Sequence, residues 1–420
     1  MSPEPHPGAA VSGPRVFYGW VIVAGAFAVL FLAYGNQYAF GVFFAALLGE
    51  FGWSRTGLSG VFSLYAFLYC AFGLVAGRLT DRWGPRVVIS IGGVFFGVGL
   101  VGMSQVRELW HPYLLFGLVA ALGMSTAYVP CNATVVKWFV RRRGLAVGVA
   151  SSGASLGTFA FPPVAHLLVD ALGWRWAYVV FGVALFVTLS LVATVMKRDP
   201  ELLGLAPDGG PRGYSVAAVE SQGKWPLSRA LRSTAFWMLF GIFAATWIPV
   251  FIPLVHAVPL ARDLGISPLL ASTVVSALGI GAIAGRLVMG GVSDLIGRKA
   301  ALAISFTLQA LAFAGFVAAS GLASLYLVAA MFGFSYGAIS TLFPAIVGDF
   351  FGREQVGALV GFLFALSGSL AALGPIGAGA IYDATGRYTL AFLLSAALNG
   401  AALLLLMLAR PPRVQRASRR

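Results

Sequence analysis

The sequence predicts an all-α polytopic membrane protein, with twelve transmembrane helices arranged as two parallel six-helix repeats. Of its 420 residues, 59% are hydrophobic and only 10% are charged, whereas about 25% are charged in soluble domains. Twelve apolar runs are long enough to cross a bilayer, which takes about 20 residues. A single offset of 213 residues relates the first six runs to the last six.

The apolar runs are bounded by charged residues or by clusters of Gly and Pro. They lie near residues 18–48, 56–79, 87–106, 111–136, 144–168, 175–196, 234–260, 268–292, 300–320, 322–348, 355–381 and 388–409. The polar segment before the first run lacks the apolar core and small-residue cleavage site of a signal peptide. We therefore expect the first run to be retained as a span.

The charged stretches divide the chain into five parts. We expect a cytoplasmic tail (1–17), an N-terminal six-helix bundle (18–196), a cytoplasmic linker (197–233), a C-terminal six-helix bundle (234–409) and a basic cytoplasmic tail (410–420). The linker combines charged residues, Pro and Gly without apolar periodicity. It predicts irregular chain with one short helical turn near its end.

Lysine and arginine residues predict the orientation, because cytoplasmic loops of membrane proteins are enriched in them. With both termini in the cytoplasm, the inner segments hold 22 of the 28 basic residues, and the outer loops hold Arg55, Arg107, Arg175, Arg262 and Arg387. We expect a multi-pass protein of the inner (plasma) membrane. The net charge of +14 is then a topology signal and a contact to anionic lipid, and nucleic acid is not expected as a partner.

One basic residue, Arg286, lies inside an apolar run. The next charge, Asp294, is eight residues further on, or about 12 Å along a helix. A guanidinium cannot lose its charge, and its burial near the bilayer centre is costly unless an anion or a wet cavity receives it. In transporters built from parallel repeats the substrate binds at this depth between the halves, so Arg286 is the first candidate for a binding residue.

Two short motifs occupy matching positions in the repeat, residues 77–86 (GRLTDRWGPR) and 290–299 (GGVSDLIGRK). Both resemble the signature of the major facilitator superfamily, which implies that superfamily's fold over nearly the whole chain. The resemblance also implies a cytoplasmic latch of ion pairs that breaks when the halves move. Its charged residues are Asp81, Arg82, Arg86, Asp294 and Arg298. A solvated turn held by glycine is the alternative.

Within that superfamily, four stretches are similar to the monocarboxylate transporter family and its bacterial relatives, among them oxalate/formate antiporters. They are residues 17–20 (FYGW), 38–44 (YAFGVFF), 50–55 (EFGWSR) and 137–148 (KWFVRRRGLAVG). Arg286 falls where that family keeps the arginine that holds the substrate carboxylate. Two features depart from the family. Ala282 stands where eukaryotic members often place Asp, and residues 357–380 lack the lysine that oxalate antiporters carry.

The single cation predicts the class of substrate. One guanidinium matches one carboxylate in a bidentate, charge-assisted pair. A dicarboxylate would call for a second cation, and none lies in any predicted span. We therefore expect secondary active transport of a small monocarboxylate, similar to lactate or pyruvate, by alternating access. Capping of Arg286 by backbone carbonyls is the structural alternative.

Polar side chains at helical spacing are candidates to complete a pocket around Arg286. The expected substrate-binding residues are Tyr34, Gln37, Tyr128, Asn132, Tyr336 and Ser340. The tyrosines fit equally well as hydrogen-bonded contacts between helices, although Pro130 favours Tyr128 because it loosens the helix there. Trp247 in the seventh span fits packing better than a substrate wall.

Proton coupling is implied by the family resemblance, yet all fourteen acidic residues lie in loops or at span ends. The titratable candidates are His256 and Asp263, toward the outer end of the seventh span. A histidine can titrate near neutrality, but a lone histidine in an apolar span is more often a structural group with satisfied hydrogen bonds.

Other classes of function lack their machinery in this sequence. The four His and two Cys residues show no metal-ligand spacing, and neither a nucleophile motif nor a phosphate-binding loop occurs. We expect no enzyme, no metal and no cofactor, and a monomer suffices for transport. Cys70 and Cys131 lie in apolar runs, which predicts buried free thiols. Carboxylate antiport of the oxalate/formate type and efflux of amphipathic compounds remain as alternatives.

Overall fold

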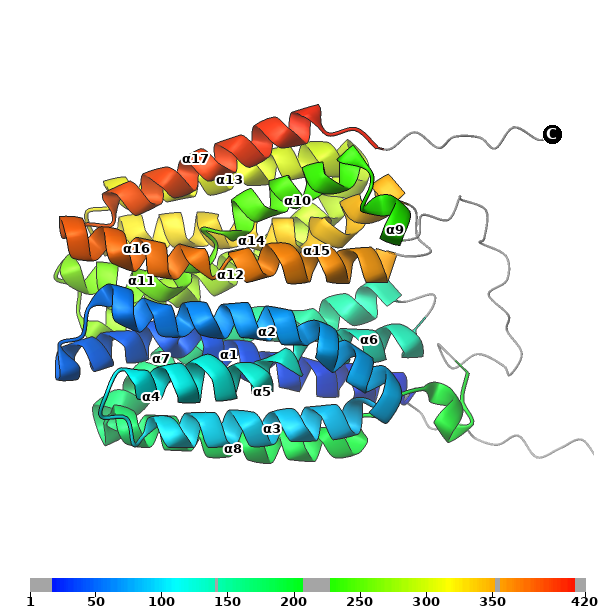
Figure 1. Cartoon of the computed structure of the whole chain (residues 1–420), viewed down its shortest axis with the longest axis horizontal. Coiled ribbons are helices and arrows are strands. Elements are labelled where there is room, and N and C mark those ends of the chain that lie inside the picture. Colours follow the sequence, from blue (N-terminus) through cyan, green and yellow to red (C-terminus); the bar gives the residue numbers. More distant parts are fainter. Residues whose placement is uncertain (1–16, 140–142, 207–226, 352–355, 412–420) are drawn as a thin grey trace, which may run out of the picture.

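The computed structural model describes residues 17–139, 143–206, 227–351 and 356–411. In these ranges the chain is helical, without strands, and twelve helices are long and apolar enough to cross a membrane. They run side by side along the long axis of the molecule (Figure 1). The predicted all-α, twelve-span architecture is therefore confirmed.

The first six spans are built from nine helical segments. They are α1 (Gly19–Phe51), α2 (Arg55–Trp83), α3 (Pro85–Met103), α4 (Trp110–Pro112), the π-helix η1 (Tyr113–Ala120), α5 (Ala121–Ser125), α6 (Tyr128–Trp138), α7 (Arg143–Leu172) and, as the sixth span, α8 (Trp174–Val195). The segments from α4 to α6 together form the fourth span.

The remaining segments follow a short 3₁₀ turn, η2 (Pro200–Leu203). They are α9 (Leu227–Ala230), α10 (Thr234–Trp247), α11 (Phe251–Asp263), α12 (Pro268–Ile296), α13 (Arg298–Ala318), α14 (Leu322–Phe351), α15 (Val356–Leu370), α16 (Leu373–Thr385) and α17 (Thr389–Leu408). The turn predicted near the end of the linker is α9. Residues 207–226 of the linker lie outside the described residues, and the predicted domain boundaries stay predictions.

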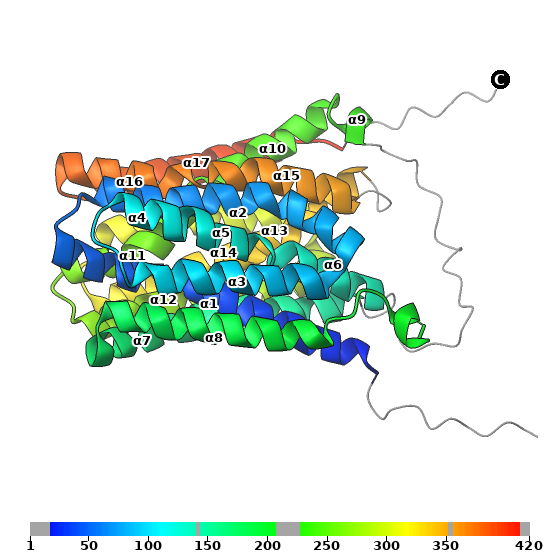
Figure 2. The same ribbon diagram turned by 60° about the horizontal axis from the view of Figure 1, so that its bottom comes forward.

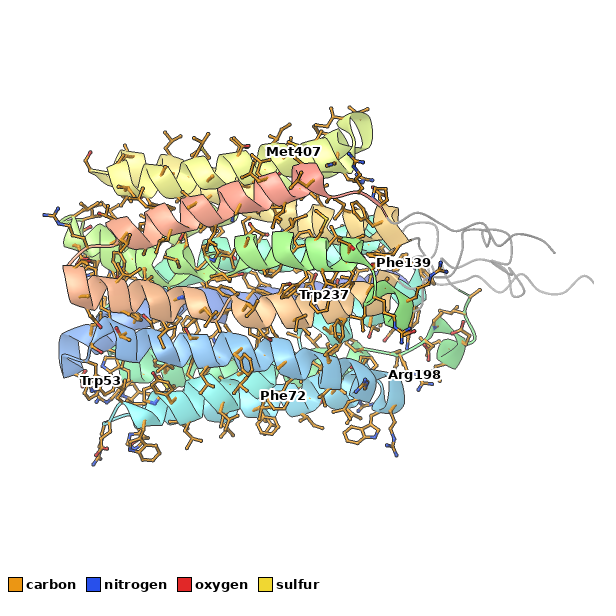
Figure 3. All side chains as sticks on the ribbon, turned by 45° about the horizontal axis from the view of Figure 1, so that its top comes forward. Trp53, Phe72, Phe139, Arg198, Trp237 and Met407 are labelled. Atoms are coloured by element: carbon orange, nitrogen blue, oxygen red, sulfur yellow. The ribbon has the colours of Figure 1, made fainter. Side chains whose placement is uncertain are left out.

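The two ends of the molecule differ. Phe139 and Arg198 mark the end where α9 lies, and Trp53 marks the opposite end (Figure 3). We call these the linker end and the far end. The two six-span halves meet where α7 contacts α12, α1 contacts α11, and α2 contacts α15 and α16. Both ribbon views show α2 beside α15 and α16 (Figure 2).

Three spans that the sequence predicts as continuous are interrupted, and proline accounts for each interruption. A proline removes one backbone donor and clashes with the carbonyl four residues earlier. In each interrupted span a proline lies four residues after a residue of the break. These prolines are Pro130, Pro253 and Pro375. The breaks lie at residues 126–127, 248–250 and 371–372. Non-helical backbone is tolerated in a membrane only where protein or a wet cavity surrounds it, and the residues of these breaks are mostly buried.

Glycines bring α12 and α14 into backbone contact beside Arg286. A Cβ on Gly285 would lie 1.9 Å from the carbonyl oxygen of Phe334, and one on Gly333 would lie 2.0 Å from that of Leu278. Small residues allow such close approach between membrane helices. The contact fixes the position of α12 against its own half, and with it the position of Arg286.

We expect Gly285→Ala to lower the thermal midpoint of the purified protein, because the two helices must separate to admit a Cβ. Overpacking of this kind costs about 1–3 kcal/mol. Gly291→Ala on the same helix is the matched control, since nothing lies within 4 Å of the added carbon. Equal midpoints for the two variants would show that the backbone contact does not stabilise the fold.

Candidate functional site

Arg286 lies at the interface between the two halves. Its Nη1 donates a hydrogen bond to the carbonyl oxygen of Ser151 on α7, at 3.1 Å. The buried Nε has no hydrogen-bond partner within the described part of the chain. Capping of Arg286 by backbone carbonyls, the structural alternative, is represented by this one hydrogen bond. A guanidinium has five N–H donors. Donors remain for a carboxylate.

Tyrosines from both halves gather near Arg286. The hydroxyl groups of Tyr34, Tyr38 and Tyr128 are close enough to interact electrostatically with the guanidinium. The Tyr38 hydroxyl lies 3.0 Å from that of Tyr336, which joins α1 to α14. The ring of Tyr34 lies 6.3 Å from that of Tyr128, centroid to centroid. The structure therefore brings together Tyr34, Tyr128 and Tyr336, which were predicted separately, and adds Tyr38.

Asn132 connects to Arg286 through Ser151. Its Nδ2 donates to the carbonyl oxygen of Tyr128 at 2.9 Å, and its Oδ1 accepts from the Ser151 hydroxyl at 3.3 Å. The carbonyl of the same serine accepts from Arg286. Asn132 thus lies in the same polar cluster as the guanidinium.

Gln37 and Ser340 have different surroundings. Gln37 is buried, and neither of its amide atoms has a hydrogen-bond partner among the described residues. Ser340 donates to the carbonyl oxygen of Gly337 at 2.9 Å, a bond within its own helix. It lines a small cavity together with Tyr336 and Trp247. Both residues remain predicted site residues.

An aromatic wall faces the polar cluster. Tyr128 stacks on Phe364 of α15 with centroids 5.7 Å apart, and Trp247 packs edge-on against Phe364 at 5.2 Å. Trp247 also lies 6.2 Å from the ring of Phe343. Trp247 thus contacts two aromatic side chains, which fits packing and a substrate wall alike. Phe364, between Tyr128 and Trp247, is a residue that the sequence did not single out. Such a wall suits the apolar part of a small ligand.

The far end is closed by contacts that centre on Arg55 of α2. Its Nη2 forms an ion pair with Asp263 of α11 at 2.8 Å, and its Nη1 donates to the Tyr388 hydroxyl at 2.7 Å. The guanidinium also lies 3.8 Å above the ring of Tyr382. Its own backbone N–H donates to Asp383 of α16 at 3.1 Å. One residue of the first half therefore holds three helical segments of the second.

His256 is fully buried and continues this network inward. Its Nε2 lies 3.1 Å from the carbonyl oxygen of Pro375 and 3.3 Å from the Ser59 hydroxyl, and its Nδ1 lies 2.9 Å from the Tyr388 hydroxyl. A carbonyl only accepts, so Nε2 carries a proton, and Nδ1 is free to accept from Tyr388. Burial raises the pKa of the Tyr388 hydroxyl well above its ordinary value, so this group keeps its proton. His256 therefore has partners at both ring nitrogens.

The residues around the polar cluster differ in exposure. His256 is fully buried and Tyr38 is 3% exposed, whereas Tyr128 is 38% exposed despite its place in the middle of a span. The hydrogen bond from Asn132 to Tyr128 is exposed as well. Arg286 itself is half-buried, between the closed contacts of the far end and the partly exposed Tyr128.

The predicted latch lies at the linker end. The side chains of Asp81 and Asp294 lie outside the described residues. Arg82 and Arg86 are exposed, and Arg298 donates a hydrogen bond to the Ser293 hydroxyl. The latch therefore stays a prediction.

Some functional contacts were missed because they join residues distant in the sequence. The charge pattern places Arg55 in an outer loop, and the sequence does not single out Tyr388 or Asp383 as its partners. The outer loops contain few charged residues, so pairing each outer Arg with each outer Asp would have identified Arg55 and Asp263 as candidates. In the described ranges, no group of three or more His, Cys, Asp or Glu side chains is placed to hold a metal ion. Cys70 and Cys131 are buried free thiols, as predicted.

Comparison with known proteins assigns the chain to a family. The family model of the Major Facilitator Superfamily matches residues 26–259 and 247–420. Monocarboxylate transporter 11 of Homo sapiens is 32% identical over 415 residues, covering 95% of this chain and 83% of that protein. MFS-type transporter 1 of Ophiocordyceps sp. (strain BCC 1869) is 29% identical over 379 residues, covering 89% of this chain and 80% of that protein.

A solved structure has the same fold. It is a bacterial homologue of the human lysosomal transporter Spinster, in an inward-facing and unoccupied conformation, with a TM-score of 0.66 at 15% identity over 94% of this chain and 96% of that chain. The fold and the family match define a multi-pass membrane transporter of the Major Facilitator Superfamily. Within that superfamily the chain belongs to the monocarboxylate transporter family, as the four stretches around residues 17–20, 38–44, 50–55 and 137–148 predicted.

We expect Arg55→Ala to open the far end, because it removes an ion pair, a hydrogen bond and a cation–π contact between the halves. Hydrogen bonds to charged groups contribute about 1.5–3 kcal/mol each, so labelling of Ser63→Cys by a water-soluble maleimide should be roughly tenfold faster. Cys70→Ala and Cys131→Ala provide a background without native thiols. Arg107→Ala, an exposed arginine at the same end, should leave the labelling rate unchanged. Equal rates in both variants would contradict a gate at Arg55.

Proposed function

We propose that the protein moves a small monocarboxylate, similar to lactate or pyruvate, together with a proton across the inner (plasma) membrane by alternating access. The observation that carries this proposal is Arg286, a guanidinium in the middle of a span with one backbone acceptor and an unpartnered buried Nε. A carboxylate would complete its hydrogen bonds in a charge-assisted pair. We also propose that both termini and the linker lie on the cytoplasmic side of the membrane.

One carboxylate fits better than two. Residues 357–380, which include most of α15 and α16, contain no charged residue, so the second half supplies Arg286 without a second cation opposite it. The tyrosine hydroxyls near Arg286 supply donors for a carboxylate oxygen or a substrate hydroxyl. The aromatic wall of Tyr128, Phe364 and Trp247 contacts the apolar part of the substrate. Relatives named monocarboxylate transporters support the same class.

The closed far end corresponds to the outer side in this proposal. The sealed network around Arg55 and the exposure of Tyr128 then describe a conformation open to the cytoplasm. Release of the substrate into the cytoplasm requires this conformation, whereas uptake requires the network to break. The contacts of Arg55 must therefore break when the outer side opens and form again when it closes.

The proton is proposed to act on the same network. An imidazolium at His256 would carry a second N–H toward Tyr388, whose oxygen already accepts from Arg55. Its positive charge would also face the guanidinium across that hydroxyl. Protonation of Asp263 would instead remove the partner of Arg55. Either event weakens the closed far end, which links proton binding to opening.

We expect Arg286→Ala to abolish counterflow of monocarboxylates in proteoliposomes, and Arg286→Lys to reduce it at least tenfold because an ammonium cannot bind a carboxylate bidentately. The panel includes lactate, pyruvate, formate, oxalate and malonate. Arg262→Ala, an exposed arginine outside the site, is the matched control and should retain counterflow. If oxalate or malonate exceeds every monocarboxylate, the argument from a single cation is wrong.

The same panel tests the alternatives. Efflux of amphipathic compounds is favoured by the aromatic wall alone, and it predicts that Arg286→Ala leaves transport largely intact. Oxalate/formate exchange predicts that oxalate is the best counter-substrate.

We expect uptake by the parent protein to fall several-fold as the outside pH rises from about 5.5 to about 8, because fewer protons are available to open the far end. His256→Gln or Asp263→Asn should make uptake independent of pH, while exchange of labelled for unlabelled substrate continues. His166→Gln, outside the network, should behave like the parent. Equal uptake by the parent at both pH values would rule out proton symport.

A further inference from the structure

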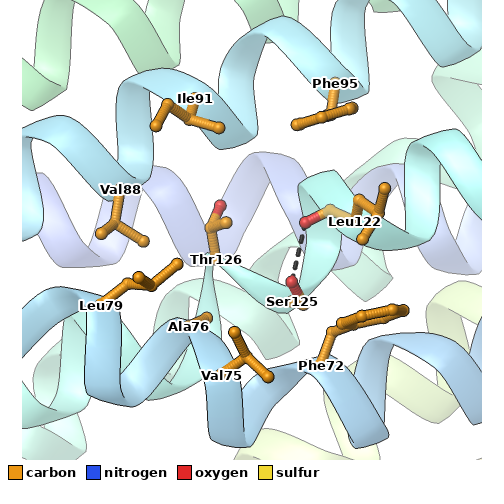
Figure 4. A pocket seen from close by; sticks show the side chains of 10 residues that line it. All are labelled: Phe72, Val75, Ala76, Leu79, Val88, Ile91, Phe95, Leu122, Ser125 and Thr126. Atoms are coloured by element: carbon orange, nitrogen blue, oxygen red, sulfur yellow. Dashed lines mark hydrogen bonds between the residues drawn. The ribbon is translucent and has the colours of Figure 1, made fainter.

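An apolar groove lies between α2 and α3 on the surface of the first half, away from the Arg286 site (Figure 4). Its cavity volume is about 120 Å³. The lining residues are Phe72, Val75, Ala76 and Leu79 of α2, Val88, Ile91 and Phe95 of α3, and Leu122, Ser125 and Thr126 from the fourth span. The groove is open on one side, where Val75 is 46% exposed and Ile91 is 40% exposed. In a membrane-spanning protein, such a surface contacts lipid acyl chains.

The floor of the groove offers no free donor to a ligand. The Ser125 hydroxyl donates to the carbonyl oxygen of Leu122 at 2.8 Å, and the Thr126 hydroxyl donates to that of Gly123 at 2.8 Å. Gly92 lets Thr126 pack against α3, since a Cβ at that position would overlap the threonine side chain. The groove is therefore suited to a hydrocarbon chain and not to a polar solute.

Basic and aromatic residues stand at one end of the groove. Phe72, Val75 and Leu79 form a stripe along α2 at helical spacing, and Arg82 continues the stripe three residues later, about 5 Å further along the axis. Beside it, Trp83 is 49% exposed. Gly84, with φ of 82°, turns the chain sharply into α3, where Arg86 follows. Both arginine side chains are exposed.

This order of groups matches the chemistry of a phospholipid. Tryptophan and basic residues mark the level of lipid headgroups at the edge of the hydrocarbon region. A guanidinium pairs with a phosphate through a planar fork of donors. Arg82 follows the groove stripe of α2, and Arg86 lies in the first turn of α3 at the same end. Their positive charges favour a lipid with net negative charge over a zwitterionic lipid.

We propose that this groove binds one acyl chain of an anionic phospholipid whose headgroup contacts Arg82 and Arg86. The site is separate from the polar cluster at Arg286, and it does not depend on the transported substrate. The lipid occupies the space between α2 and α3 where they diverge from the turn at Gly84. A bound lipid would restrain the relative position of these two helices.

Native mass spectrometry of the purified full chain tests the headgroup contact, with phosphatidylglycerol and phosphatidylcholine of identical acyl chains as probes. We expect tighter binding of phosphatidylglycerol. Each basic residue near a charged lipid surface contributes about 1 kcal/mol, so Arg82→Gln should weaken its binding about fivefold. The double variant with Arg86→Gln should weaken it roughly 25-fold. Arg410→Gln, an exposed arginine at the end of α17, should have less than about a twofold effect.

A phosphatidylglycerol with a photoreactive acyl chain locates the hydrocarbon. We expect crosslinked peptides from α2 and α3 that include residues 72–79 and 88–95. Val75→Trp fills the groove and should remove most of this crosslinking, whereas Val183→Trp, an equally lipid-exposed position on α8, should not. Equal binding of the two lipids, an Arg82→Gln effect no larger than that of Arg410→Gln, or crosslinks confined to other helices would each overturn the proposal.

Discussion

A permanent positive charge in the middle of an apolar span is the constraint around which the rest of this structure is organised. Arg286 cannot be neutralised, so the cost of its burial must be met by acceptors or by access to water. The structure supplies one backbone acceptor on the opposite half, and three tyrosine hydroxyls lie within electrostatic range. Some hydrogen-bond donors of Arg286 therefore remain without a partner among the described residues, which suits a binding residue. If the protein filled every donor, little affinity for a ligand would remain.

Prolines within the spans free backbone carbonyls or interrupt the helix, and two contacts show the consequence. Where Pro163 removes the donor that would bond to Phe159, the freed carbonyl accepts from Ser276 of the other half at 2.6 Å. The breaks in the seventh and eleventh spans pack against each other, with Gly374 closely approaching the carbonyl oxygen of Ile248. The first contact joins the two halves through a backbone carbonyl, and the second packs two breaks of the second half together.

The far end is linked to helix α1 by two hydrogen bonds and one ring contact. Arg55 donates to Tyr388, which lies within hydrogen-bond distance of His256, and Phe44 of α1 packs on the imidazole with ring centroids 5.4 Å apart. The same helix carries Tyr34 and Tyr38 toward Arg286. Helix α1 therefore contacts both the far-end network and the polar cluster.

The sequence by itself determined the spans, the repeat, the family and the isolation of Arg286, because hydropathy, charge counts and motifs are read along the chain. Most residues of the polar cluster are candidates from the sequence alone, but the sequence does not show which of them contact each other. Tyr38 and Tyr336 are 298 residues apart, and Arg55 and Asp263 are 208 apart. Only the tertiary structure decided that these pairs meet. Spans that are apolar on every side leave the rotation of each helix about its axis undetermined, and that rotation selects which polar side chains face each other.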